Sequence, residues 1–254
     1  MRLNCALVSS FLFVSAALAG HHPEKQQPPF LNRVEKSIIS TTVFPLRESA
    51  GVTWIAEPEE AIETAAGTFT VPSAEGDVGS FFVIMVGIST SDCNAITIGV
   101  GIIGQIFEDG VFYRGFAKGR EMVLSPDPIL AGNVIRASIE VESTTTAFVT
   151  LVNTDGGTPW SKLIYGDPQD TRCRQDVKWI ITTRSGADTL PEFDTLVIKE
   201  MSVEVSKENE KTKIVPRRPN IITDNYVGHF RVETSIMFYR DHVIIIYIPP
   251  PPPS

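Results

Sequence analysis

Paired carboxylates are the first side chains in this sequence that could do chemistry. Glu140 and Glu142 lie in the run 134–142, where Ile139 and Val141 alternate with polar residues. Alternation with a period of two places both carboxylates on one face of a β-strand. Two acids that flank a sugar bond are the machinery of a glycoside hydrolase. A solvated outer strand face gives the same pattern, and it is the interpretation we favour.

A second run carries a mixed polar face. Between residues 176 and 183, Asp176, Lys178, Ile180 and Thr182 alternate with apolar residues, so they should share one strand face. A carboxyl group poised to exchange protons is the usual general base or acid of hydrolysis. The cation at Lys178 opposes a raised pKa for any carboxyl group nearby.

Other catalytic signatures are missing from the sequence. It has no Gly-x-Ser-x-Gly, and the later part of the chain contains only His229 and His242. The glycines at 99, 101 and 104 imitate a phosphate-binding loop in number, but no helix is expected after them. The adjacent His21 and His22 are too small a set for a metal site. We therefore expect no metal and no cofactor.

The composition indicates one soluble globular domain. Of 254 residues, 43% are hydrophobic and 20% charged, and the net charge is −8. Such a length suits a single β-sandwich domain. An acidic surface repels phosphate backbones and anionic lipid heads, so we expect neither nucleic acid nor membrane as a partner, and we expect a monomer.

The N-terminal segment reads as a targeting signal. Residues 1–19 combine a basic start, an apolar stretch and the cleavage pattern Ala17-Leu18-Ala19, so we expect a signal peptide and a secreted, extracellular protein. A membrane anchor is the alternative, although the apolar stretch is short for a span. Residues 20–46 are polar and proline-rich, as in a leader, a pro-segment or a flexible arm.

Two cysteines remain after the expected cleavage, Cys93 and Cys173. In an oxidising compartment they should pair with each other. Two buried free thiols are the alternative.

The rest of the chain reads as strands. Apolar, β-branched and aromatic runs are separated by turn signals, and no stretch has a convincing helical period; the strongest runs are 67–72, 81–88, 95–106, 111–116, 134–142, 147–152, 177–183, 195–205 and 242–248. We interpret 58–66 as extended or loop, 206–213 as a solvated loop and 249–254 as a proline-rich tail. The pattern predicts an all-β protein, an antiparallel two-sheet β-sandwich.

Several segments together resemble the glutamic peptidases, or eqolisins, which are secreted, acid-active fungal endopeptidases. They are Ser49-Ala-Gly-Val52, Gly67-Thr-Phe-Thr-Val-Pro72, Val86-Gly-Ile88 before Cys93, the run 131–141, Cys173-Arg174 leading into Trp179-Ile-Ile181, and Pro191-Glu-Phe193. The resemblance spans about residues 47–248. It implies a concanavalin A-like jelly roll and a Cys93–Cys173 disulfide.

The resemblance also implies where catalysis should reside. The family uses a Gln and a Glu on neighbouring strands: the Glu exchanges protons with a water, and the Gln stabilises the oxyanion. Counted from the cysteines, those positions hold Gly99 and Thr182 in this chain. Gly99 has no side chain, and the hydroxyl of Thr182 does not titrate in the acid range. No replacement is in reach, since Gln105 would need a shift of six residues.

The family's substrate groove is altered as well. Ser49 and Met85 stand where the family has tryptophans, Lys178 replaces a carboxylate, and Arg114 replaces an acidic residue near Tyr113. We therefore expect an inactive homologue whose groove, lined by Ser49, Met85, Gly99, Tyr113, Asp176, Lys178 and Thr182, holds an extended peptide or glycan. An active acid endopeptidase with a rearranged site is the alternative. The proline-rich tail leaves a degenerate gene product as a third interpretation.

Overall fold

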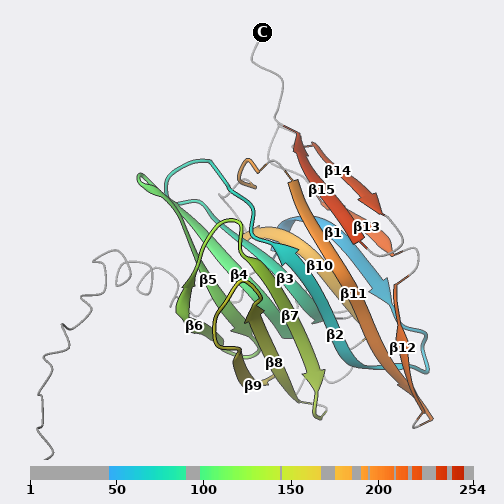
Figure 1. Cartoon of the computed structure of the whole chain (residues 1–254). Helices are drawn as coiled ribbons and strands as arrows, with labels where there is room; N and C mark the ends of the chain where they lie inside the picture. The colour runs from blue at the N-terminus through green and yellow to red at the C-terminus, as the bar shows by residue number, and fades with distance from the viewer. Residues whose placement is uncertain are drawn as a thin grey trace, which may run out of the picture. The chain divides into compact units, whose positions relative to one another are not determined.

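A computed structural model describes residues 46–89, 98–143, 145–166, 175–184, 190–193, 195–208, 210–216, 219–224, 233–238 and 242–248. They form fifteen strands and no helix (Figure 1). The expected signal peptide, most of the leader, both cysteines and the proline-rich tail lie outside the described residues.

Two antiparallel sheets pack face to face, as the sequence predicted (Figure 1). The seven-stranded sheet has the order β13-β1-β10-β3-β4-β5-β6. Its strands are β13 (Asn220–Asp224), β1 (Leu46–Ile55), β10 (Asp176–Arg184), β3 (Phe81–Ser89), β4 (Ile98–Phe107), β5 (Gly110–Lys118) and β6 (Met122–Ile129).

The eight-stranded sheet has the order β14-β15-β11-β2-β7-β8-β9, with β12 added to β11. Its strands are β14 (Glu233–Phe238), β15 (His242–Ile248), β11 (Thr195–Lys207), β2 (Ala61–Thr70), β7 (Val134–Val141), β8 (Thr146–Asn153), β9 (Trp160–Tyr165) and β12 (Glu210–Ile214).

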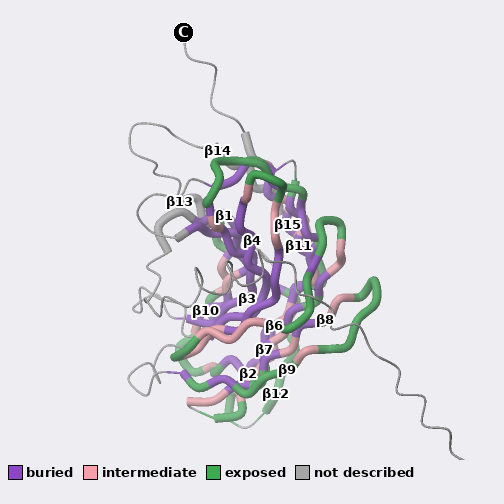
Figure 2. Tube along the Cα trace, turned by 90° about the vertical axis from the view of Figure 1, so that its left-hand side faces the viewer, coloured by how far each residue is buried: buried purple, intermediate pink, exposed green. Residues whose placement is uncertain are grey.

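The two sheets differ in how their outward faces are buried. In β7 and β8 buried and less buried residues alternate, so one face packs on the core and the other meets water. In β3 and β4 nearly every residue is buried, on both faces (Figure 2). This explains the apolar run at 81–88 and the described part of the run at 95–106, in which glycines are the main interruptions.

Trp179 is the largest fully buried side chain and joins the two sheets. Its indole Nε1 donates a 2.9 Å hydrogen bond to the carbonyl of Ala66 on β2. Beside it, a Cβ at Gly67 would lie 2.8 Å from the indole Cδ1, so the missing side chain makes room for the ring. Large and small residues thus complement each other across the core.

The sequence suggested that the segment 206–213 is a solvated loop, and this interpretation is wrong. It forms a hairpin between β11 and β12, in which Lys207 pairs with Glu210. The side chains of β12 are mostly exposed, so no apolar period marked the strand. The interpretation of 58–66 as extended or loop is confirmed, because β2 begins at Ala61.

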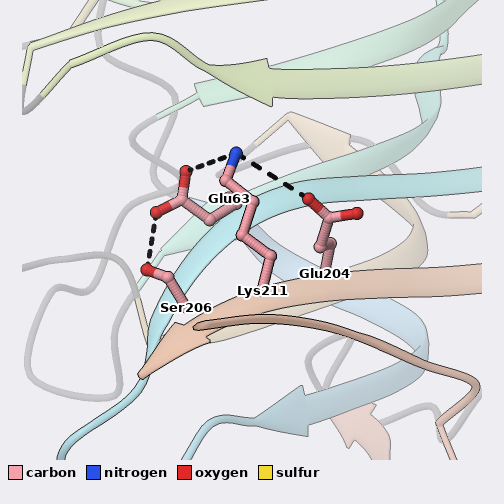
Figure 3. Close-up of polar contacts among 4 residues, drawn as sticks. All are labelled: Glu63, Glu204, Ser206 and Lys211. Carbon is pink, nitrogen blue, oxygen red and sulfur yellow. Dashed lines mark hydrogen bonds and ion pairs between the residues drawn. The ribbon is translucent and has the colours of Figure 1, made fainter. Parts of the chain in front are cut away.

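A polar cluster ties this hairpin to β2 (Figure 3). The ammonium of Lys211 lies 3.7 Å from a carboxylate oxygen of Glu63 and 3.9 Å from one of Glu204. Ser206 donates a 2.6 Å hydrogen bond to the other oxygen of Glu63. Exposed ion pairs contribute less than about 1 kcal/mol each, so the strand pairing holds β12 and the cluster adds little.

The hydroxyl of Tyr113 is expected to contribute about 1–2 kcal/mol to stability, which Tyr113→Phe would remove. It donates a 2.6 Å hydrogen bond to the carbonyl of Pro72 inside the core, and its ring meets Phe82 edge-on. Phe keeps the packing but loses the bond. Urea unfolding measures the loss, and Tyr165→Phe on the exposed end of β9 is the matched control, expected to change nothing.

The same hydroxyl should affect stability at high pH. Burial raises the pKa of Tyr113 to about 12 from 10.0, so the phenol stays protonated in the folded chain when the unfolded chain has already ionised. Unfolding is therefore favoured progressively as the pH rises from about 10 to about 12, and Tyr113→Phe should remove that part of the loss. Identical high-pH profiles for both proteins would contradict the assignment.

Candidate functional site

The candidate site is the outer face of the seven-stranded sheet, meaning the face turned away from the eight-stranded sheet. Trp179, Phe82 and Tyr113 point into the core, so by alternation their strand neighbours point outward. On the four central strands these outward residues include Asp176, Lys178, Ile180 and Thr182 of β10; Phe81, Val83, Met85, Gly87 and Ser89 of β3; Gly99, Gly101, Ile103 and Gln105 of β4; and Phe112, Arg114, Phe116 and Lys118 of β5.

The two positions assigned to the dyad share this face but are not on neighbouring strands. Thr182 of β10 pairs with Val83, and Gly99 of β4 pairs with Gly87, so β3 runs between them. Two strand spacings and four residues along the strand separate the two Cα atoms by roughly 16 Å. Two long side chains that reach toward each other and share a water could bridge that gap, whereas glycine and threonine cannot.

The hydroxyl of Thr182 is already engaged. Ser49 of β1 lies opposite it and donates a 3.0 Å hydrogen bond to Thr182 Oγ1. Thr182 is completely buried and Ser49 is 8% exposed. Ser49 and Thr182, which the sequence comparison assigned to a tryptophan position and to the glutamate position of the family, thus hydrogen-bond to each other.

The middle of the outer face is apolar. Met85, Ile103, Ile180 and Phe116 are each buried to 3% exposure or less. A Cβ at Gly101 would collide with the carbonyl of Ile84 on the next strand, so β3 and β4 approach too closely for any side chain there. These side chains are shielded from water in the structure, and none of them can transfer a proton.

Polar groups occupy the two ends of the face. Asp176 lies opposite Ser89 at one end, and Gln105 lies opposite Phe81 at the other. All three polar side chains are buried, with Asp176 only 3% exposed. Eight residues of strand separate the carboxylate from the amide, a distance of roughly 27 Å, so they cannot act on a common water.

Tyr113 is not on this face, contrary to the sequence-based expectation. Its side chain points into the core, 2% exposed. Its neighbour Arg114 takes the outward position, where Nε donates a 2.7 Å hydrogen bond to the carbonyl of Ser125. Lys118 and Ser89 are outward residues that the sequence-based prediction of the groove did not include, although alternation from Arg114 would have found Lys118. Gln105 was considered only as a replacement for the catalytic glutamine.

The paired carboxylates lie elsewhere. Glu140 and Glu142 are exposed residues at the outer face and end of β7, in the eight-stranded sheet. Within the described ranges, no group of three or more His, Cys, Asp and Glu side chains is arranged to hold a metal ion. Nor does the described part of the chain include a helix with the length and hydropathy of a membrane span.

Comparisons with known proteins agree on one family. The model of the Peptidase A4 family matches residues 47–247. The solved structure of scytalido-glutamic peptidase with a transition-state analogue inhibitor is similar, with a TM-score of 0.61 and 19% identity over 80% of this chain and 98% of that one. No curated protein matches.

Two further structures are similar. One is SCP-B, a member of the eqolisin family of peptidases, in complex with the tripeptide Ala-Ile-His, with a TM-score of 0.58 and 20% identity over 80% of this chain and 98% of that one. The other is aspergilloglutamic peptidase from Aspergillus niger, with a TM-score of 0.55 and 17% identity over 66% of this chain and 99% of that one. At these identities the likeness shows the fold.

Proposed function

The chain belongs to the peptidase A4 family, and from that premise we propose that it is a secreted, catalytically inactive eqolisin homologue that binds an extended peptide. One observation carries the proposal. Thr182, at the position assigned to the catalytic glutamate, is completely buried and hydrogen-bonded to Ser49. Residue 182 carries no carboxyl group to activate a water, and residue 99 carries no amide to stabilise an oxyanion.

Peptide is the ligand that the relatives suggest. SCP-B was solved with the tripeptide Ala-Ile-His. Scytalido-glutamic peptidase was solved with a peptide-based transition-state analogue. An apolar sheet face suits an extended chain, because a peptide in that conformation presents alternate side chains to one surface. A glycan is the other ligand class that the sequence left open.

The alternative is an acid endopeptidase with a rearranged site. Asp176 favours it, as a buried carboxyl group on the outer face beside Ser89. Gln105, the amide on the outer face of the four central strands, lies roughly 27 Å away along the sheet, too far to serve the same scissile bond. A rearranged site would therefore need its second group from outside these strands.

A protease assay tests the proposal. Full-length protein expressed with residues 1–254 and collected from the medium is expected to leave a denatured protein substrate intact from pH 2 to pH 6. Scytalido-glutamic peptidase in the same assay shows that the conditions support hydrolysis. The intact mass of the collected protein reports cleavage before Gly20 and a Cys93–Cys173 disulfide, which are parts of the same proposal.

Digestion would overturn the inactive assignment. If Asp176→Asn then abolished cleavage while the variant kept its melting temperature, the rearranged peptidase would replace it. If a glycan bound the outer face and none of the tested peptides did, the peptide part of the proposal would be wrong.

A further inference from the structure

Three apolar side chains lie next to one another on the outer face of the eight-stranded sheet, the face turned away from the seven-stranded sheet. Phe148 of β8 pairs with Leu163 of β9, and Tyr165 follows two residues later on the same side of β9. Their exposed fractions are 43%, 41% and 60%. We call these three residues the aromatic patch. Apolar side chains that are exposed singly are normal, but a contiguous group on a regular surface often marks an interaction site.

Polar side chains lie beside the aromatic patch on the same face. Glu140 of β7 pairs with Phe148, so its exposed carboxylate lies in the same transverse row. The next row, roughly 7 Å along the strands, holds the hydroxyls of Ser138, Thr150 and Ser161. Thr150 and Ser161 share a 3.0 Å hydrogen bond and keep acceptor lone pairs, whereas neither Ser138 nor Glu140 is hydrogen-bonded to another described residue. Exposed rings and available hydrogen-bonding groups are thus neighbours on this face.

The size of the aromatic patch argues against a protein partner. The exposed parts of its three side chains amount to on the order of 300 Å², whereas a stable interface buries about 800 Å² on each partner. Strand addition at the edge strand β9 is restricted as well. The carbonyl of Tyr165 already accepts a 2.7 Å hydrogen bond from the backbone N–H of Arg120, and Pro159, just before the strand, has no N–H to donate. A small ligand that lies flat on the face fits better than a second copy or an added strand.

The charges on this face favour a neutral ligand. Arg136 and Glu140 are the charged outward residues of β7, and the outward residues of β8 and β9 are uncharged. Lys162 of β9 pairs with the buried Val149, so it belongs to the opposite face of the sheet. One cation and one acid give the described outward surface of these three strands no net charge, although the chain as a whole has −8. A charged ligand therefore gains no long-range attraction here.

We propose that the aromatic patch and the polar groups beside it bind a neutral oligosaccharide, at a site separate from the candidate site on the other sheet. A pyranose ring has an apolar face of C–H groups and a rim of hydroxyls, so it needs exposed rings beside hydrogen-bonding groups. Phe148 and Tyr165 are diagonal neighbours, roughly 7–8 Å apart, and can stack on two sugar rings of one chain. The carboxylate of Glu140 is placed to accept strong, charge-assisted hydrogen bonds from the hydroxyls of the sugar on Phe148.

Isothermal titration of the full-length protein with cellohexaose, chitohexaose and laminarihexaose tests the proposal. We expect at least one of these neutral sugars to bind, with an affinity that is the same at 50 and 300 mM NaCl because the ligand carries no charge. Phe148→Ala and Tyr165→Ala should each weaken binding about tenfold, since each removes a stacking ring. Glu140→Gln should weaken it about threefold through the loss of charge-assisted hydrogen bonds. Leu130→Ala, at a residue 67% exposed between β6 and β7, is the control and should change nothing.

Three results would overturn the proposal. The first is that none of the three hexasaccharides binds. The second is binding that survives both Phe148→Ala and Tyr165→Ala, because the sugar would then lie elsewhere. The third is dimerisation in analytical ultracentrifugation that Tyr165→Ala abolishes, which would assign the aromatic patch to a second copy of the chain. None of these results bears on the proposed function, since the candidate site is on the other sheet. Circular dichroism and melting curves confirm that each variant is folded before its affinity is measured.

Discussion

Trp179→Ala should lower the free energy of unfolding by about 3–5 kcal/mol, the range for deleting a fully buried tryptophan. The indole fills the space between the sheets, and its Nε1 donates the 2.9 Å hydrogen bond to Ala66 of β2. Alanine would leave a cavity and end that bond. Since a domain of this kind is stable by only about 5–15 kcal/mol, the change removes a large share of the total. Urea unfolding at neutral pH measures it.

The glycine beside the ring supplies the control. A Cβ at Gly67 would lie 2.8 Å from Cδ1 and 2.9 Å from Nε1 of Trp179, so Gly67→Ala alone should destabilise by about 1–3 kcal/mol through overpacking. In the Trp179→Ala background the methyl group has room, and its cost should disappear. Additive effects of the two substitutions would contradict the contact, because residues that share one packing site must be coupled.

Several of the strands that the sequence predicted have a regular burial pattern. The run 81–88 became β3 and 134–142 became β7, since unbroken and alternating apolar patterns are the marks of strands covered on two faces and on one face. The predicted runs did not include β1, β6, β9, β12, β13 and β14. For β9 and β12 the reason is that their side chains are largely exposed. Such edge strands are held by backbone pairing with a neighbour, a long-range contact that leaves no period in the residues themselves.

The candidate site was predictable only in part, for a related reason. On β10 the alternation placed Asp176, Lys178 and Thr182 together, and the register of the sheet agrees. On β5 the same reasoning failed, because Tyr113 to Phe116 are buried on both faces and burial gave no clue to direction. The placement of Lys178 and Lys118 in one transverse row depends on the register of four strands, which no local pattern encodes. A resemblance to a family can identify positions, but only coordinates align Lys178 with Lys118.

The sharpest stability test of the proposed inactivity is Thr182→Glu, which places a carboxyl group at the position assigned to the catalytic glutamate. Thr182 has no exposed surface, and its opposite neighbour on β3 is Val83. A glutamate there should be overpacked at any pH, by about 1–3 kcal/mol. It should also be hard to ionise, because burial in apolar surroundings raises a carboxyl pKa.

The pH dependence distinguishes ionisation from overpacking. If the folded-state pKa of the new carboxyl group is raised, the unfolded chain ionises first, near pH 4.3, and unfolding is favoured progressively above that pH. Thr182→Gln has nearly the same size without the charge, so it is the matched control. The stability difference between the two variants should be near zero at pH 4 and about 3 kcal/mol, in favour of glutamine, at pH 7. Urea unfolding of both proteins at both pH values measures it.

A small difference at both pH values would have a clear consequence for function. It would mean that a carboxylate at residue 182 reaches water, which is what a general base needs in order to exchange protons with a substrate water. Residue 182 would then be accessible to water, as a catalytic position must be. The hydrogen bond between Ser49 and Thr182 would not be what keeps water from this position. The proposed inactivity would then rest on the identity of the side chains at residues 99 and 182 alone. A large, pH-dependent difference would instead mean that the packing of the face keeps residue 182 away from water. Restoring the carboxyl group would then not restore proton transfer to a substrate water.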